Sequence, residues 1–181
     1  MDFQDKDVEL MFIADKIESV TRHNLNVKLS KKYNRLQLPA EQEKAIEEIW
    51  SKRMAENPLL WNGTKFRLDS IDNVDGKVTF NIGITGYRDF LGTNWSPDVS
   101  FLHELGIQQT GKSQAFLSDA LGVGALVISS DNKMILMRRS KHCGEAVGLL
   151  DIPGGHPEPK VTLQHDFYAR SPRFPRLAMH A

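Results

Sequence analysis

The most informative stretch of the sequence lies between residues 138 and 159. It reads Arg138-Arg-Ser-Lys-His-Cys-Gly-Glu-Ala-Val-Gly-Leu-Leu-Asp-Ile-Pro-Gly-Gly-His-Pro-Glu-Pro159. Two arginines follow an apolar run, and their forked donors suit phosphate groups. The paired glycines after the first proline allow a backbone to approach a ligand closely. These features predict an anion site, and the alternative interpretation is an ordinary hairpin with arginines on its surface.

Short apolar runs around this stretch predict closely spaced strands. Val123 to Ser129 and Lys133 to Arg138 flank an Asp-Asn turn, and Leu149 to Ile152 leads into a Gly-Gly turn. Strands that follow one another so closely favour an antiparallel or mixed sheet. The glycines of Gly122-Val-Gly124 are typical of a strand that packs closely against another backbone.

The part of the chain before these strands predicts helices and a hairpin. Pro39 opens a helix that extends to about Glu56, because apolar residues recur there at helical spacing, and Asn57-Pro58 ends it. The runs Lys65 to Ile71 and Lys77 to Ile84 flank Asn-Val-Asp-Gly, which predicts a hairpin.

Weaker signals predict further elements. Val8 to Ala14 and Val27 to Leu29 are apolar runs that indicate strands. Ser96 and Pro97 indicate the N-cap and first residue of a helix, and Gly106 indicates its end.

These patterns divide the chain into three parts. Residues 1–112 are expected to form an N-terminal domain, and residues 113–160 carry the closely spaced strands. Residues 161–181 have no helical or strand period and contain prolines and scattered arginines. We expect this tail to be disordered.

The overall composition restricts the class of protein. Lys and Arg number 23, as do Asp and Glu, so no net charge attracts nucleic acid or anionic lipid. A single cysteine, Cys143, excludes a disulfide framework and fits a reducing compartment. The longest apolar run, Ala120 to Ile128, is far shorter than the roughly 20 residues of a membrane span. We expect an intracellular, cytoplasmic protein with neither nucleic acid nor membrane as a partner.

Residues 106–113 match a second pattern, that of a phosphate loop. The segment Gly106-Ile-Gln-Gln-Thr-Gly-Lys-Ser113 has the spacing in which backbone amides surround phosphates and the lysine reaches the terminal ones. Such a loop follows a buried strand, whereas a helix is expected before this segment. We therefore favour a polar loop between two domains, with a phosphate-loop nucleotidase as the alternative.

Four segments resemble a known family. Leu149-Leu-Asp-Ile-Pro-Gly-Gly-His-Pro-Glu-Pro159 looks like the start of a Nudix box. Three upstream segments resemble the uridine diphosphate glucose pyrophosphatase subfamily of the Nudix hydrolases: Pro58-Leu-Leu-Trp-Asn-Gly-Thr-Lys-Phe-Arg-Leu68, Thr85-Gly-Tyr-Arg-Asp-Phe-Leu-Gly-Thr-Asn-Trp95 and Leu121-Gly-Val-Gly-Ala125. The resemblance extends from about residue 40 to Lys160.

The resemblance implies a fold and an activity. The fold is of the α/β class, with a family-specific N-terminal α+β domain followed by a Nudix α/β/α sandwich that has a mixed sheet. The activity is magnesium-dependent hydrolysis of UDP-glucose and UDP-galactose to UMP and a sugar 1-phosphate. A divalent cation held by carboxylates would neutralise the two phosphates and activate water.

The resemblance also implies a set of substrate-binding residues: Trp61, Tyr87, Arg139, Gly144, Asp151, His156 and Glu158. Arg139 would hold a phosphate, while Trp61 and Tyr87 would offer aromatic faces to uracil or the sugar. The remaining positions would form hydrogen bonds with the substrate. As alternatives, the two aromatic residues belong to the core and Asp151 caps the turn before Pro153.

The sequence departs from the Nudix pattern after Lys160. The pattern places a glutamate six residues beyond its first glycine and then Arg-Glu and Glu-Glu on a helix. Counted from Gly155, this position is Val161, and residues 161–181 contain no glutamate. We therefore expect a C-terminally truncated member with no catalytic residues, no magnesium ligands and little or no hydrolysis. A fragment that binds a UDP-sugar or a protein without cleavage is the alternative.

This departure has a structural consequence for residues 113–160. A Nudix sheet is covered by helices, so an incomplete one would show an uncovered apolar face and a free edge.

Overall fold

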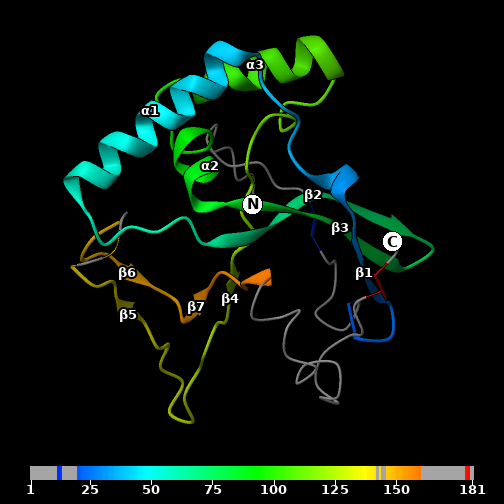
Figure 1. Ribbon diagram of the computed structural model, residues 1–181. Helices are drawn as coiled ribbons and strands as arrows, with labels where there is room; N and C mark the ends of the chain where they lie inside the picture. Colours follow the sequence, from blue (N-terminus) through cyan, green and yellow to red (C-terminus); the bar gives the residue numbers. More distant parts are fainter. Residues whose placement is uncertain (1–11, 14–19, 142, 144–145, 160–177, 180–181) are drawn as a thin grey trace.

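The computed structural model describes residues 12–13, 20–141, 143, 146–159 and 178–179 (Figure 1). Within these residues the chain forms a mixed four-stranded sheet, three α-helices and two small two-stranded sheets. The expected α/β class with a mixed sheet is confirmed. No helix of the described part has both the length and the apolar character needed to cross a bilayer.

A long hairpin forms the centre of the larger sheet. Strand β2 (Thr64–Val74) pairs antiparallel with β3 (Lys77–Gly86). The turn residues Asp75 and Gly76 have φ values of 51° and 73°. Positive φ at both central residues is what a type I′ two-residue turn requires, and the twist of that turn matches the twist of the strands. The hairpin predicted from Asn-Val-Asp-Gly is therefore confirmed.

Two further strands extend the sheet in the order β2-β3-β1-β8. Strand β1 (Leu25–Leu29) confirms the strand predicted at Val27 to Leu29 and runs parallel to β3. Strand β8 (Ala178–Met179) runs parallel to β1. Phe12 and Ile13 are not in a strand, and the rest of the strand predicted at residues 8–14 lies outside the described residues. Apart from β8, the predicted tail also lies outside them.

Helix α1 (Ala40–Glu56) confirms the helix predicted from Pro39 to about Glu56. Pro39 is its N-cap, acids occupy its first turn and Arg53 its last turn, which suits the helix dipole. Ile46 and Trp50, one turn apart, are its buried residues. The helix thus buries the stripe that the apolar spacing predicted.

Helix α3 (Val99–Thr110) differs from its prediction at both ends. It begins after Asp98 rather than at Pro97, and Gly106 lies inside it. Gly106 is required by packing, because a Cβ there would collide with the carbonyl oxygen of Lys112. Gly111, with φ of 75°, is the residue that ends the helix. A short helix, α2 (Tyr87–Gly92), was not predicted.

The position of α3 contradicts the phosphate-loop interpretation of residues 106–113. The first residues of that pattern form the last turn of a helix, and the second glycine is its C-cap. Phosphate loops instead present the amides at the start of a helix. A phosphate-loop nucleotidase is therefore wrong for this segment.

The three helices lie on one side of the β2–β3 hairpin (Figure 1) and enclose the core with the chain that follows α3. One cluster of buried core residues consists of Leu38, Ile46, Leu102, Ala115, Phe116 and Leu117. The backbone amide of Leu36 donates a hydrogen bond of 2.8 Å to the carbonyl of Ala115, which fixes the returning chain. We call residues 20–118 the N-terminal unit.

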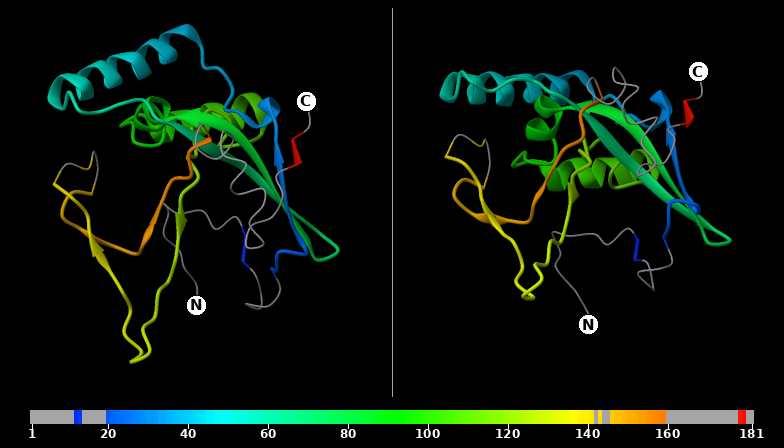
Figure 2. Two further views of the ribbon diagram at one scale, coloured as in Figure 1. Left: turned by 60° about the horizontal axis from the view of Figure 1, so that its bottom comes forward. Right: turned by 90° about the horizontal axis from the view of Figure 1, so that it is seen from below.

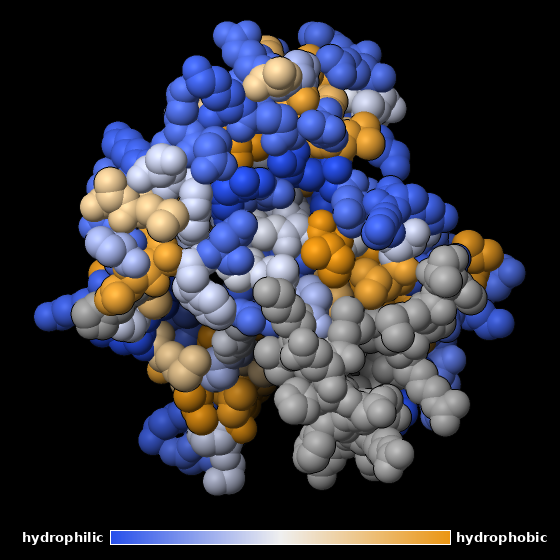
Figure 3. All heavy atoms as spheres, viewed as in Figure 1, coloured by the Kyte–Doolittle hydropathy of each residue, from blue (hydrophilic) through white to orange (hydrophobic). Residues whose placement is uncertain are grey.

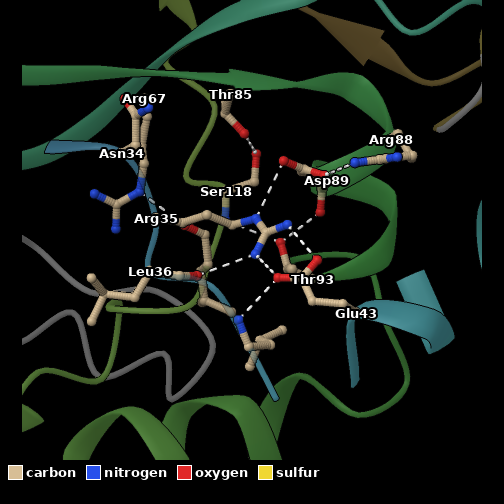
Figure 4. Close-up of polar contacts among 12 residues, drawn as sticks. Asn34, Arg35, Leu36, Glu43, Arg67, Thr85, Arg88, Asp89, Thr93 and Ser118 are labelled. Atoms are coloured by element: carbon tan, nitrogen blue, oxygen red, sulfur yellow. Dashed lines mark hydrogen bonds and ion pairs between the residues drawn. The ribbon is translucent and has the colours of Figure 1, made fainter. Parts of the chain in front are cut away.

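A shielded ion network joins the elements of this unit. Arg35 contacts Glu43 of α1 at 2.6 Å and Asp89 of α2 at 3.2 Å (Figure 4). Glu43 also accepts a hydrogen bond of 2.9 Å from the backbone amide of Leu38. The hydrogen bond from Arg35 lowers the pKa of the Glu43 carboxyl below its usual value, although burial opposes this shift. The network therefore favours an ionised carboxylate.

Residues 119–159 form an arm that extends away from the larger sheet (Figure 2). Its strands are shorter than predicted: β4 (Val123–Gly124), β5 (Met137–Arg138), β6 (Leu150–Asp151) and β7 (Gly154–Gly155). Strands β4 and β7 pair antiparallel, as do β5 and β6. The prediction of a turn at Gly154-Gly155 is wrong, because these glycines form β7. A Cβ at Gly154 would approach the carbonyl oxygen of Val123 to 2.5 Å, so the pairing requires glycine.

The expected apolar face of the arm is exposed in the structure. Twelve of its large apolar side chains have exposed fractions between 36% and 64%, and part of this surface is visible in Figure 3. They are Val123, Leu126, Val127, Ile128, Met134, Ile135, Leu136, Met137, Val147, Leu149, Leu150 and Ile152.

The arm begins along the edge of β2. The amide of Leu68 donates to the carbonyl of Asp119 at 3.0 Å, and the amide of Leu121 donates to the carbonyl of Phe66 at 2.8 Å. Arg67, between these two β2 residues, has a side chain that is only 1% exposed. Its guanidinium donates to the carbonyl oxygens of Tyr33, Gln114 and Leu117 at 2.7–2.9 Å and to Asp69 at 2.6 Å. Arg67 Nη2 also lies 3.6 Å from Asp119 Oδ2 at the start of the arm, so Arg67 links the unit to the arm.

Candidate functional site

Two of the predicted substrate-binding residues, Trp61 and Glu158, converge at Gly63. A Cβ at this buried glycine would lie 3.6 Å from Glu158 Oε1, 3.7 Å from Lys65 Nζ and 3.9 Å from Trp61 Cη2. Lys65 and Glu158 form an ion pair of 3.3 Å with side chains 14% and 27% exposed, whereas Trp61 is 66% exposed. A carboxylate, an ammonium group and an accessible indole therefore surround one small residue.

Tyr87 lies close to this cluster through its backbone. Its amide donates a hydrogen bond of 3.0 Å to the carbonyl of Gly63. Its half-buried ring stacks on Phe90 at 6.2 Å and meets Trp50 edge-on at 6.5 Å. The structure therefore supports part of the core-aromatic alternative for Tyr87, while Trp61 is clearly a surface residue.

Arg139 and Asp151 meet at a second place, beside the β5–β6 pair of the arm. Arg139 Nη1 lies 3.2 Å from Asp151 Oδ2, and the amide of Arg139 donates to the carbonyl of Leu149 at 2.9 Å. The Asp151 carboxylate also accepts a hydrogen bond of 2.9 Å from the amide of Ile152. Asp151 thus caps the chain before Pro153, as the alternative predicted, and at the same time orients Arg139.

His156 connects the end of β7 to the start of the arm. Its Nδ1 lies 3.1 Å from the carbonyl oxygen of Leu121, so the protonated ring nitrogen can donate to that carbonyl. The ring also lies next to Gly122, where a Cβ would be 3.6 Å from Cε1. The remaining predicted residue, Gly144, lies outside the described residues.

Sequence reasoning missed Lys65, although it lies in one of the segments that carry the resemblance. The available signal is the alternation of Lys65, Arg67 and Asp69 along β2, which places their side chains on one face of the strand. The partner of Lys65 is 93 positions away in the sequence, so local patterns could not reveal the pair.

The donor groups present do not fit a divalent cation. Among the residues that the structure describes, no three His, Cys, Asp or Glu side chains are grouped so that they could hold a metal ion. The carboxylates of Asp151 and Glu158 contact Arg139 and Lys65 instead. These pairings leave the Asp151 and Glu158 carboxylates beside cationic side chains rather than in a group of metal ligands.

Comparisons with known proteins identify the class. No protein-family model matches the chain. The chain is 39% identical over 161 residues to uridine diphosphate glucose pyrophosphatase NUDT22 of Mus musculus. This alignment covers 87% of this chain and 52% of the relative. The corresponding protein of Homo sapiens is 41% identical over 145 residues, covering 77% and 48%. Nudix hydrolase 9 of Arabidopsis thaliana is 38% identical over 127 residues, covering 65% and 40%.

The chain is thus a relative of Nudix hydrolases. More narrowly, it is similar over most of its length to uridine diphosphate glucose pyrophosphatases, which confirms the resemblance seen in its sequence. The chain spans about half the length of the curated relatives it matches.

Proposed function

We propose that the protein acts on UDP-sugars, UDP-glucose and UDP-galactose, in the magnesium-dependent hydrolysis that yields UMP and a sugar 1-phosphate. We further propose that residues 1–181 bind the UDP-sugar but hydrolyse it little or not at all. The observation that carries the proposal is the identity of 39–41% to UDP-glucose pyrophosphatases over 77–87% of this chain. The described residues favour binding of the UDP-sugar over its hydrolysis.

In this proposal the substrate contacts come from both parts of the chain. Trp61 offers an accessible indole face on which uracil or the sugar ring can stack. Tyr87 contributes through the part of its ring that its aromatic neighbours leave accessible. Glu158 accepts hydrogen bonds from substrate hydroxyl or N–H groups, because an ionised carboxylate acts only as an acceptor.

The phosphates are assigned to the arm. Arg139 would donate two parallel hydrogen bonds to a phosphate, and Asp151 would keep its guanidinium oriented. Gly144 would bring the neighbouring backbone close to the ligand, and His156 would add a hydrogen bond. Each of these roles is a proposal for the residues named.

We also propose that residues 113–160 are the first part of a Nudix sandwich and that residues 1–112 are the preceding domain. The exposed apolar side chains of the arm support the first assignment, because they require further layers to cover them. Ala115, Phe116 and Leu117 pack in the N-terminal core, so the packing favours a boundary slightly later, after Ser118.

Two measurements on residues 1–181 test the proposal. Isothermal titration calorimetry with UDP-glucose should give saturable binding, and ADP-glucose should bind more weakly because its base differs. Release of UMP from UDP-glucose with magnesium should be far slower than with the full-length mouse relative, assayed in parallel. Absence of UDP-glucose binding by a folded chain contradicts the binding role. Turnover similar to that of the full-length relative contradicts the claim that these residues alone hydrolyse little.

A further inference from the structure

Lys65 reaches from the N-terminal unit to the segment that follows β7. Its Nζ lies 3.3 Å from Oε1 of Glu158, and both side chains are largely shielded from water. Ion pairs in such surroundings are screened less by salt than exposed pairs are. Separating the two partners would leave both charges partly desolvated and unpaired. Because this costs free energy, a shielded pair keeps its partners together.

The N-terminal side of this pair is well anchored. Besides the hydrogen bond from Tyr87 to Gly63, Asn62 Oδ1 accepts a hydrogen bond of 2.9 Å from the amide of Arg88. Gly86 makes this approach possible, because a Cβ there would lie only 2.6 Å from Asn62 Oδ1. The loop that carries Trp61 is therefore fixed to β3 and α2.

The other side of the pair belongs to the arm. Glu158 follows β7, a strand of two residues, and the contact with Lys65 ties this segment to β2. Lys65 also keeps the Glu158 carboxylate next to the ring of Trp61, since all three groups meet over Gly63. A shift of this segment would separate the carboxylate from the indole.

We infer that Lys65 is a positioning residue of the UDP-sugar site. It acts by holding the ionised Glu158 carboxylate beside the indole of Trp61, where that carboxylate accepts hydrogen bonds from the ribose hydroxyls or the N3–H group of uracil. A carboxylate has about four lone-pair positions, so a bond from Lys65 is compatible with further donors. This inference rests on the proposed function, because it takes Trp61 and Glu158 as substrate contacts.

The test measures UDP-glucose affinity by calorimetry for the wild-type chain and for variants of the pair. Lys65→Met should weaken binding about tenfold, which corresponds to about 1.4 kcal/mol. Lys65→Arg should restore most of the affinity, because Arg can also pair with Glu158. Glu158→Gln should weaken binding to a similar extent, and Lys65→Met/Glu158→Gln should be no weaker than the poorer single variant. Lys77→Met, an exposed lysine at the β2–β3 turn, is the matched control and should bind as wild type does.

Thermal unfolding of each variant separates positioning from a purely structural role. A structural role alone predicts a lower melting temperature with unchanged affinity for the folded fraction, and that result would overturn the inference. Fully additive losses in the double variant would overturn it as well, because Lys65 would then not act through Glu158. If wild type binds and Lys65→Met binds equally well, the inference fails while the proposed function stands. If wild type does not bind UDP-glucose, both fail.

Discussion

The N-terminal unit and the arm contain similar residue types but place them differently. In the unit, Leu102 and Phe116 are buried and the charged Arg67 is enclosed by hydrogen-bond partners. In the arm, Leu126 and Ile128 are exposed. The difference shows that apolar pattern alone yields only short paired strands, and that a second layer is needed to convert the pattern into a packed core.

The largest expected effect of a substitution concerns the junction between the two regions. Arg67→Met should lower the free energy of unfolding by about 3–5 kcal/mol, because it leaves buried carbonyls and Asp69 without their donor. Arg138→Met, in the exposed part of the arm, is the control and should change stability little. Urea unfolding monitored by circular dichroism measures both. Equal losses for the two arginines would contradict the distinction between the regions.

A pair of identical truncations compares the apolar residues directly. Leu102, which is 4% exposed, and Leu126, which is 64% exposed, are each replaced by alanine. Leu102→Ala should cost about 2–4 kcal/mol through lost burial and an internal cavity, whereas Leu126→Ala should cost less than about 0.5 kcal/mol. The same unfolding experiment measures both variants. A large loss from Leu126→Ala would show that the arm is packed more tightly than its exposure indicates.

The ion pairs allow a third comparison. Arg35→Met removes the shielded contacts with Glu43 and Asp89 and should cost about 1–3 kcal/mol. Lys133→Met removes the exposed pair with Asp131 at the tip of the arm and should have no measurable effect. Thermal unfolding at low and high salt provides the check: the loss from Arg35→Met should persist at high salt because shielded pairs are screened little, and Lys133→Met should match wild type at both salt concentrations. A loss from Lys133→Met as large as that from Arg35→Met would argue against this comparison.

The smallest effects concern pH, and here the unit and the junction should respond in opposite directions. The folded-state pKa of Glu43 is lowered, so its contribution to stability is present above about pH 4.5 and is lost as the pH falls through the lowered value. Burial raises the pKa of Asp119 above its usual value, although Asn94, Arg67 and His103 favour its charged form. Ionisation of Asp119 therefore costs stability as the pH rises through the raised value.

Two variants test these directions by urea unfolding at about pH 6 and about pH 3. Glu43→Gln should reduce the stability lost on acidification. Asp119→Asn should raise stability more at the higher pH, and asparagine tolerates the positive φ of 41° at this position. If Asp119→Asn instead lowers stability at the higher pH only, the attraction of Arg67 outweighs burial at this carboxylate.

Local signals predicted the elements whose cause is local. The spacing of Ile46 and Trp50 predicted α1, and Asp75-Gly76 predicted the hairpin, because both depend on residues close in sequence. The end of α3 was misplaced because Gly106 serves close packing rather than capping. Helix α2 is too short for its apolar period to stand out.

In the candidate site, too, local patterns did not predict contacts between residues far apart in the sequence. Its residue types were predicted through the family resemblance, and the structure brings Trp61 near Glu158 and Arg139 near Asp151. The role of Lys65 depends on a contact between β2 and the end of the arm, so no pattern within either segment indicated it.

We propose that the N-terminal unit and the arm together form one UDP-sugar site. Hydrogen–deuterium exchange of residues 1–181, with and without saturating UDP-glucose, tests this proposal. A shared site should slow exchange in two separate peptides, one covering residues 58–65 and the other covering residues 138–156. Protection confined to one of these peptides, or absent from both in a folded chain, would contradict a shared site.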